Sequence, residues 1–493
     1  MRNQARDDGI PLLLWVLLAS LTALLLAFSQ TVAFFGDEGF HLLAARLVNA
    51  GKRLYLDFFY PHAPLYVYIS AAWMRVVGDT WRSVHALTAL CTSTSIALVT
   101  WYVFTRSRGS RWRLANAASA ALLMGLNILV LWYGTIGPPY GPSLVLIVAA
   151  FLLVVASVGR VGGPQSFLAG VCAGTAAASL LLTAPVAPIL WLWLLRHAGP
   201  GDRFKKGAYF LAGTGLPFLP LLWLLGHGPR EVLFDVVGYH LLYRATWVDR
   251  SVSVLQSLRT LASWLNSTQA LLLILLATVA LTVPPSPSEW DEQRRREFRL
   301  CGWLVAGLAL CLATPLPTFP HYFILVVPFV SILAALGMNV LGSRLWPSAR
   351  PLYVVLPLLV LFALGLAKLA VQQRETFYAP PWAMVEELAR EVNRVAPPDG
   401  LVHASEAVLF AARRLPPPGM ENSFGSLLRL PPEQLARLHV LPQSQIDAWL
   451  AAGHFHTVTI GTTDPRVQAL GLLRRYARQE QLHHFYILSD PVP

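Results

Sequence analysis

Long apolar runs, separated by short polar or basic segments, dominate the first three quarters of the chain. Each run is about 17–25 residues long, enough for a helix to cross the roughly 30 Å hydrocarbon core of a bilayer. The pattern therefore predicts about eleven transmembrane spans, and an all-α polytopic membrane domain over residues 1–371. The predicted spans are at residues 11–34, 82–104, 114–132, 142–158, 166–182, 184–196, 208–226, 267–284, 300–315, 321–341 and 352–371.

A different pattern begins near residue 372, where apolar positions form short helices and strands bounded by Pro and Gly. The predicted helices are at residues 382–395, 406–414, 433–438, 444–452 and 465–477. The predicted strands are at residues 401–404, 457–460 and 483–488. Residues 372–493 are therefore predicted to form a second, small α/β domain.

The basic residues indicate how the chain is oriented. With a cytoplasmic N-terminus, the inner segments contain Arg2, Arg6, Arg106, Arg108, Arg111, Arg113, Arg160, Arg196, Arg203, Lys205, Lys206, Arg294, Arg295, Arg296, Arg299, Arg344 and Arg350. The short outer loops around residues 133–141, 183 and 316–320 contain no Lys or Arg. This is the positive-inside pattern. It predicts a multi-pass protein of the inner cell membrane with an extracytoplasmic C-terminal domain.

Composition agrees with a membrane protein. The chain is 55% hydrophobic and 13% charged, and its mean hydropathy of +0.53 lies far from that of soluble domains. The net charge of +12 follows from the inner loops, so it indicates topology and no nucleic-acid partner. All four cysteines lie in apolar spans and imply no disulfide framework. The histidines of the C-terminal domain lack the spacing of metal ligands.

An acidic pair, Asp37-Glu38, directly follows the first span and opens an amphipathic stretch. Two adjacent acids at a bilayer surface are costly unless a site there needs negative charge or a proton acceptor. Two interpretations are open: the pair caps a helix, or it belongs to an extracytoplasmic active site.

Two outer segments, residues 36–81 and 227–266, are too long to be simple loops. Each mixes aromatic, basic and apolar residues at helical spacing, as in the predicted helix over residues 65–77. This composition predicts helices that lie in the membrane interface. Such helices can wall a cavity that is open to lipid on one side and to water on the other.

The order of these motifs resembles the GT-C superfamily of polytopic glycosyltransferases, in the branch of protein O-mannosyltransferases and lipid A aminoarabinose transferases. The resemblance rests on Gly36-Asp37-Glu38-Gly39 after the first span, the stretch from Gly51 to Tyr66, Gly78-Asp79 with Arg82, and the stretch from Phe319 to Pro328. It implies a sugar donor linked to a polyprenyl phosphate, and transfer to a glycan, lipid or protein acceptor outside the cytoplasm.

Transfer from a glycosyl phosphate needs a base that takes the proton of the acceptor. Asp37 suits this role, because a helix N-terminus favours its ionised form while partial burial raises its basicity. Glu38 lies about 100° further around the helix, so we assign it a supporting or acceptor-binding role. The second outer loop, residues 132–142, contains no acid. A mechanism without a metal or other cofactor is therefore favoured.

The leaving phosphate needs cationic or hydrogen-bonding partners. The candidates are Arg82, Arg244, His321, Tyr322 and His62. For Arg82 an alternative is an interfacial anchor, and for Arg244 and His62 an ordinary structural role.

Other functions remain open at this stage. Within the same chemistry, the chain could be a ligase or polymerase that uses a lipid-linked glycan. A transporter or lipid flippase is the alternative from another class, but such proteins place ionisable groups or broken helices near the bilayer midplane. The spans here are almost free of ionisable residues.

Overall fold

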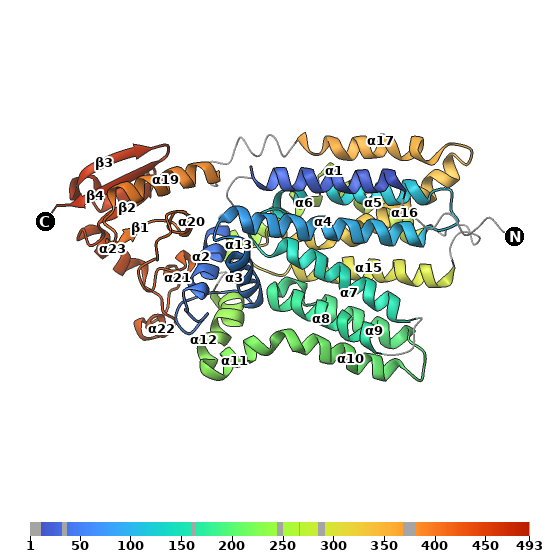
Figure 1. Cartoon of the computed structure of the whole chain (residues 1–493), viewed down its shortest axis with the longest axis horizontal. Coiled ribbons are helices and arrows are strands. Elements are labelled where there is room, and N and C mark those ends of the chain that lie inside the picture. Colours follow the sequence, from blue (N-terminus) through green and yellow to red (C-terminus); the bar gives the residue numbers. More distant parts are fainter. Residues whose placement is uncertain are drawn as a thin grey trace. The chain divides into compact units, whose positions relative to one another are not determined.

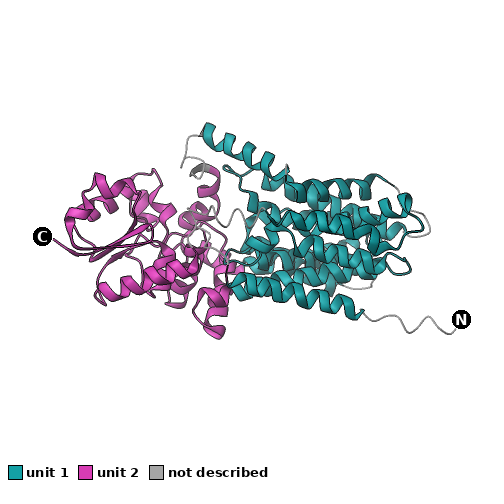
Figure 2. Ribbon diagram, turned by 90° about the horizontal axis from the view of Figure 1, so that it is seen from above, with its two compact units in different colours: residues 1–30, 85–218, 251–375 teal, residues 31–84, 219–250, 376–493 magenta. Residues whose placement is uncertain are grey.

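The structure is a computed structural model that describes residues 11–31, 37–158, 163–243, 250–265, 267–283, 291–367 and 381–492. The chain forms two compact units, coloured separately in Figure 2. Unit 1 comprises residues 1–30, 85–218 and 251–375, and unit 2 comprises residues 31–84, 219–250 and 376–493. The boundary between domains that the sequence suggests after residue 371 stays a prediction.

Unit 1 is a bundle of apolar helices that run along a common direction (Figure 1). Its elements are α1 (Leu12–Ser29), α4 (Trp81–Arg106, from His85 on), α5 (Arg113–Gly125), α6 (Ile128–Tyr133), α7 (Tyr140–Val158), α8 (Pro164–Ser179), η1 (Leu181–Thr183), α9 (Val186–His197), α10 (Arg203–Gly215), η2 (Leu216–Phe218), α13 (Arg250–Leu265, from Ser251 on), α14 (Thr268–Thr282), α15 (Glu292–Leu312), η5 (Pro320–Val326), α16 (Val327–Leu345) and α17 (Pro351–Leu364).

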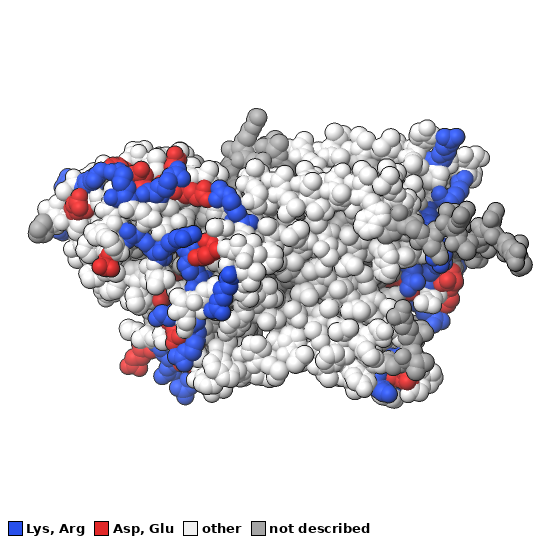
Figure 3. Space-filling model, viewed as in Figure 1, with Lys and Arg blue, Asp and Glu red and all other residues white. Residues whose placement is uncertain are grey.

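Within the described part of the chain, five helical stretches are long and apolar enough to cross a membrane, and a bent pair of helices would make a sixth. They are Leu12–Ser29, Trp81–Arg106, Tyr140–Val158, Arg203–His227 and Pro320–Leu345, with the pair Ser251–Leu265 and Thr268–Thr282. On the face of unit 1 shown in Figure 3, the described charged side chains gather near the end where α1 begins and leave a wide uncharged band. A mostly helical, multi-pass membrane protein is confirmed, whereas the count of about eleven spans stays a prediction.

Two glycines let α8 and α10 approach closely. Gly170 and Gly174 are four residues apart on α8, and a methyl group on them would overlap the backbone carbonyl oxygens of Phe210 and Thr214 on α10. Small residues at this spacing are how helices pack without a hydrophobic driving force between them in lipid.

The predicted span at residues 114–132 is broken in the structure. α5 ends at Gly125 and α6 begins at Ile128, so backbone groups of Leu126 and Ile128 lose their helical partners. The buried side chain of Gln269 replaces them: its amide oxygen accepts from Ile128 N–H at 2.9 Å, and its amide nitrogen donates to the carbonyls of Leu126 and Phe362, both at 3.0 Å. A helix break away from water needs such compensation.

We expect Gln269→Leu to lower the free energy of unfolding by about 1–3 kcal/mol, because it leaves buried backbone groups of the break without partners. Gln256→Leu is the matched control, since Gln256 lies on α13 and is exposed. Chemical denaturation of the purified chain in detergent measures both variants. Equal stability of the two variants would show that Gln269 does not hold the break.

Unit 2 combines the outer segments with the C-terminal part of the chain. Its helices are α2 (Glu38–Asn49), α3 (Leu65–Val77), the first turn of α4, α11 (Leu219–His227), α12 (Pro229–Leu233), the π-helix η3 (Phe234–Tyr243), α19 (Trp382–Val395), α20 (Glu406–Ala411), α21 (Ser423–Ser426), α22 (Pro432–Arg437), α23 (Gln443–Ala451), α24 (Pro465–Ala469) and α25 (Leu472–Arg475). The predicted helix at residues 65–77 matches α3.

A small sheet follows in unit 2, with strands β1 (Val402–His403), β2 (Thr457–Gly461), β3 (Tyr476–Leu482) and β4 (Phe485–Pro491). Their order is β1-β2-β4-β3, with β1 and β2 parallel and the other two pairings antiparallel. The predicted helix at 465–477 was partly wrong, because Gly471 adopts a left-handed conformation that separates α24 from α25. Tyr476 then begins β3, a strand that sequence patterning missed.

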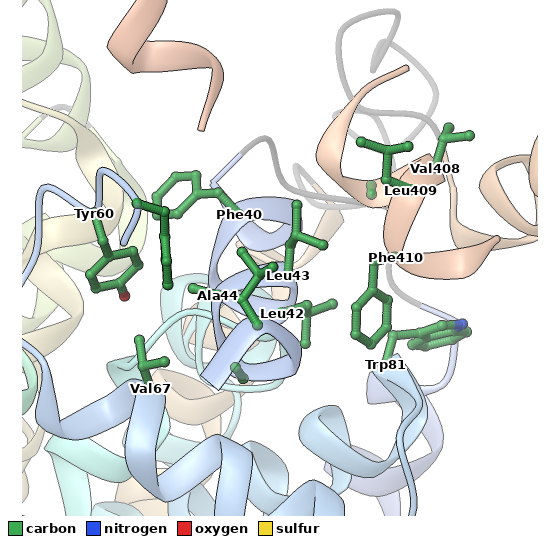
Figure 4. Packing of buried hydrophobic residues seen from close by; sticks show 14 of the residues in the cluster. Phe40, Leu42, Leu43, Ala44, Tyr60, Val67, Trp81, Val408, Leu409 and Phe410 are labelled. Carbon is green, nitrogen blue, oxygen red and sulfur yellow. The ribbon is translucent and has the colours of Figure 1, made fainter. Parts of the chain in front are cut away.

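The main core of unit 2 joins segments that are far apart in the sequence (Figure 4). Phe40, Leu42 and Leu43 of α2 share one buried cluster with residues 408–410 of α20. Arg46 fixes the same junction: it pairs with Asp79 at 2.8 Å and donates to the carbonyl of Phe410. The helix that carries the acidic pair is therefore embedded in a core to which residues 382–410 contribute.

Candidate active site

The acidic pair lies at the start of α2. Asp37 is the N-cap residue and is half-buried, but its carboxylate accepts no capping hydrogen bond from the first turn. Glu38 is the first helical residue and is 0% exposed. Its Oε2 accepts a hydrogen bond from the indole N–H of Trp382 at 3.2 Å. The two neighbouring acids thus have different surroundings, one reachable from solvent and one enclosed by protein.

Arg82 is connected to Glu38 through two stacked indole rings. Trp382 stacks on Trp81 with ring centroids 5.2 Å apart and planes 7° from parallel. Trp81 donates its N–H to Glu386 at 2.8 Å, and Arg82 pairs with the same carboxylate while its guanidinium lies 4.5 Å above the Trp81 ring. About half of the Arg82 side chain remains exposed.

His62 lies against the first turn of α2. Its ring stacks on Phe40 with centroids 5.3 Å apart, and it lies 5.1 Å from the ring of His41 and 5.4 Å from that of His240. His41, three residues after Glu38, contacts the hydroxyl of Tyr60 through Nδ1 at 2.6 Å. The structure therefore brings His62 to the first turn of α2, beside an imidazole–phenol pair that the sequence analysis did not single out.

The loop that carries Tyr60 and His62 is held by the π-helix. The N–H of Tyr60 donates to Asp235 at 2.9 Å, and His240 Nε2 donates to the carbonyl of Pro61 at 2.6 Å. Burial raises the pKa of Asp235 well above its ordinary value, while the Tyr60 N–H opposes this shift. A buried carboxyl whose hydrogen bond goes to loop backbone fixes the loop, and with it the rings that contact α2.

His321 and Tyr322 belong to η5 in unit 1. His321 is buried among rings, with centroids 5.0 Å from Tyr133, 5.6 Å from Tyr140 and 5.4 Å from Phe319. The predicted second outer loop (residues 132–142) and the motif at residues 319–328 are therefore in contact within unit 1. The acids, Arg82 and His62 belong to unit 2. Arg244 lies outside the described residues.

Among the described residues, no group of three or more His, Cys, Asp or Glu side chains is arranged to hold a metal ion. The four cysteines are free.

The comparisons identify the fold. No protein-family model and no curated protein matches the chain. Among solved structures, ArnT from Cupriavidus metallidurans bound to undecaprenyl phosphate has a TM-score of 0.65 at 14% identity, over 98% of this chain and 100% of ArnT. The apo form of ArnT gives 0.62 at 13% identity, over 97% and 99%. The apo oligosaccharyltransferase of Archaeoglobus fulgidus gives 0.51 at 14% identity, over 91% and 69%.

The chain has the GT-C fold. ArnT and the archaeal oligosaccharyltransferase are both GT-C membrane glycosyltransferases, so the fold that the motif order suggested is confirmed over nearly the whole chain. At these identities the likeness concerns the fold alone.

Several residues packed around the acids were not predicted from the sequence, among them His41, Asp235 and Trp382. His41 could have been found from its position, because residues three apart lie on one face of a helix. Asp235 and Trp382 carried no comparable signal. Asp235 stands in an amphipathic stretch, and Trp382 begins a helix 344 residues after Glu38. Their contacts depend on how distant segments pack.

Stability should depend on pH through His41. Burial lowers the pKa of His41 from 6.5 to about 3, so between these values the unfolded chain binds a proton that the folded chain does not. The stability that the neutral His41 ring contributes is complete above pH 6.5 and is lost as the pH falls toward 3. When the pH falls from 7.5 to 5, the free energy of unfolding should decrease by about 2 kcal/mol less in His41→Gln than in the wild type.

The measurement is denaturation in detergent at both pH values. His454→Gln serves as the control, because His454 is exposed on the surface of unit 2. If the wild type and His41→Gln lose stability equally on acidification, the ring is not held neutral in the folded chain.

Proposed function

We propose that this protein is a membrane glycosyltransferase that moves a sugar from a polyprenyl-phosphate-linked donor to an acceptor. The observation that carries the proposal is a half-buried acid, followed by a buried one, at the start of α2 in a chain with the GT-C fold. Similarity to ArnT, whose structure holds undecaprenyl phosphate, supports a lipid-phosphate donor.

Asp37 acts as the general base in this proposal. It accepts the proton of the acceptor's O–H or N–H, and the freed electron pair attacks the anomeric carbon of the sugar. The bond between this carbon and the phosphate oxygen breaks, and the polyprenyl phosphate leaves with the bonding pair. Its half-buried position at a helix N-terminus supports this role, since the carboxylate is not fully enclosed and the acceptor must reach it.

Glu38 is not a second base in this proposal; it supports Asp37. The complete burial of its side chain and the hydrogen bond from Trp382 suit a group that fixes the first turn of α2. A direct contact between Glu38 and a large acceptor would need this enclosure to open.

The donor phosphate is assigned to the cationic and hydrogen-bonding candidates. His62 contacts Phe40 and His41 on the helix of the acids, which favours it as a partner of the phosphate. Arg82 shares its guanidinium with Glu386 and keeps about half of its side chain exposed, so it can bind phosphate from its open side. His321, Tyr322 and Arg244 stay candidates that the sequence suggests. No metal is required in this scheme.

The site is proposed to face outward. The absence of Lys and Arg from the short outer loops, with their enrichment in the inner ones, supports an extracytoplasmic active site and C-terminal domain. The donor would then be used on the outer face of the inner membrane.

Asp37→Asn should lower turnover by roughly 10²–10⁴-fold, the range for loss of a positioned base, while it leaves insertion and folding intact. Glu38→Gln should lower turnover by less, about tenfold, because its amide keeps an oxygen that can accept from Trp382. The assay uses a strain that lacks the gene: mass spectrometry of its lipids and glycans identifies the missing sugar, and complementation with each variant measures its return.

Asp447→Asn is a suitable control, because Asp447 lies in the C-terminal segment on α23, outside the proposed site. Wild-type amounts of the sugar in cells with Asp37→Asn would refute the assignment of the base. Unchanged lipids and glycans in the deletion strain would refute the transferase itself.

Topology provides a separate prediction. A phosphatase that is active only outside the cytoplasm should be active when fused after Pro493 and inactive when inserted at residues 284–299, because basic segments stay inside. The reverse result would put the acids on the cytoplasmic side and remove the proposed sidedness.

A further inference from the structure

The buried acid of the pair accepts a hydrogen bond from a distant segment. Glu38 is 0% exposed, and the indole N–H of Trp382, itself 2% exposed, donates to its Oε2 at 3.2 Å. Trp382 is the first residue of α19, in the C-terminal part of the chain. A carboxylate without access to water depends on such donors, because its burial is costly when they are lost.

The indole of Trp382 is fixed on two sides. One face stacks on Trp81 with centroids 5.2 Å apart and planes 7° from parallel, and Phe410 meets the ring at 69° with centroids 6.4 Å apart. These contacts leave the ring little freedom to turn. The direction of its N–H toward Glu38 is therefore set before any substrate binds.

α19, the helix that carries Trp382, is itself anchored to the first turn of α4. Glu386, one turn further along α19, accepts the indole N–H of Trp81 at 2.8 Å and pairs with Arg82. Residues four apart lie on one face of a helix. The first turn of α4 thus holds α19 through Glu386, while α19 holds Glu38 through Trp382.

We propose that Trp382 is a positioning residue for sugar transfer. By fixing the carboxylate of Glu38 it fixes the first turn of α2, and hence the direction in which the neighbouring Asp37 faces the acceptor. The segment after the membrane helices then contributes directly to the geometry of the acids. This inference rests on the proposed function, since it takes the acid pair as part of the transfer site.

The two tryptophans provide a matched pair of variants. Trp382→Phe and Trp81→Phe both keep an aromatic ring in the stack. The first removes the N–H that binds Glu38, and the second removes the N–H that binds Glu386, which Arg82 continues to hold. A loss caused by the stack alone would affect both variants equally.

The experiment uses membranes of the strain that lacks the gene, complemented with the full chain or a variant, so that endogenous donor and acceptor are present. Mass spectrometry follows the rate at which the product appears. Added undecaprenyl phosphate is the probe for lipid-phosphate binding, and its inhibition constant is measured for each variant. Unfolding midpoints in detergent report on folding.

Trp382→Phe should lower the rate roughly ten- to hundredfold, as expected for a lost hydrogen bond to a charged group. The inhibition constant of undecaprenyl phosphate should not change. Trp81→Phe should lose clearly less of the rate than Trp382→Phe, because it keeps both the stack and the N–H that binds Glu38. Trp382→Phe combined with Glu38→Ala should be no slower than Glu38→Ala alone, because the indole N–H acts through a carboxylate that Glu38→Ala has already removed.

Equal rates for the two tryptophan variants would overturn the proposal. So would losses that multiply in the double variant, or a loss in Trp382→Phe that is matched by weaker lipid binding or by unfolding of the variant at the assay temperature. An active Asp37→Asn would refute the proposed function. An inactive Asp37→Asn together with an active Trp382→Phe would refute this inference alone.

Discussion

The burial of the Glu38 carboxylate is the constraint on which the candidate site depends. A carboxylate that is 0% exposed is costly to enclose, and the fold must supply hydrogen-bond donors around it. Unit 2 supplies one from Trp382 and fixes that donor with Trp81 and Phe410. Residues from three separate parts of the chain are therefore needed to keep one acid in place.

The same constraint explains the polar groups packed beside α2. His41, Tyr60 and Asp235 are all buried. His41 of α2 contacts the hydroxyl of Tyr60, and the N–H of Tyr60 donates to Asp235 of η3. Burial keeps the imidazole of His41 neutral by lowering its pKa to about 3. Hydrogen bonds between buried groups favour one arrangement of their elements, because any other arrangement leaves these groups without the partners they have here. The loop with His62 is held against α2 in this way.

Unit 1 meets a related requirement in its membrane helices. Gln269 replaces the backbone hydrogen bonds lost between α5 and α6. Glu297, buried on α15, pairs with Arg106 of α4 at 2.6 Å and accepts from Tyr102. In each case a polar side chain compensates a group that neither lipid nor apolar neighbours can satisfy. Close helix contacts such as that of Gly170 with α10 provide the rest of the packing.

The sequence by itself determined the class of the protein, because the length of apolar runs and the distribution of basic residues reflect the bilayer directly. It also identified the acidic pair, the helix at residues 65–77 and the change of pattern after the membrane helices, since these are local features. Only the tertiary structure decided that Glu38 is fully buried while Asp37 is half-buried, that Trp382 contacts Glu38, and that Asp235 holds the loop beside α2. Those contacts join residues up to 344 positions apart, and local periodicity carries no information about which distant segments pack together.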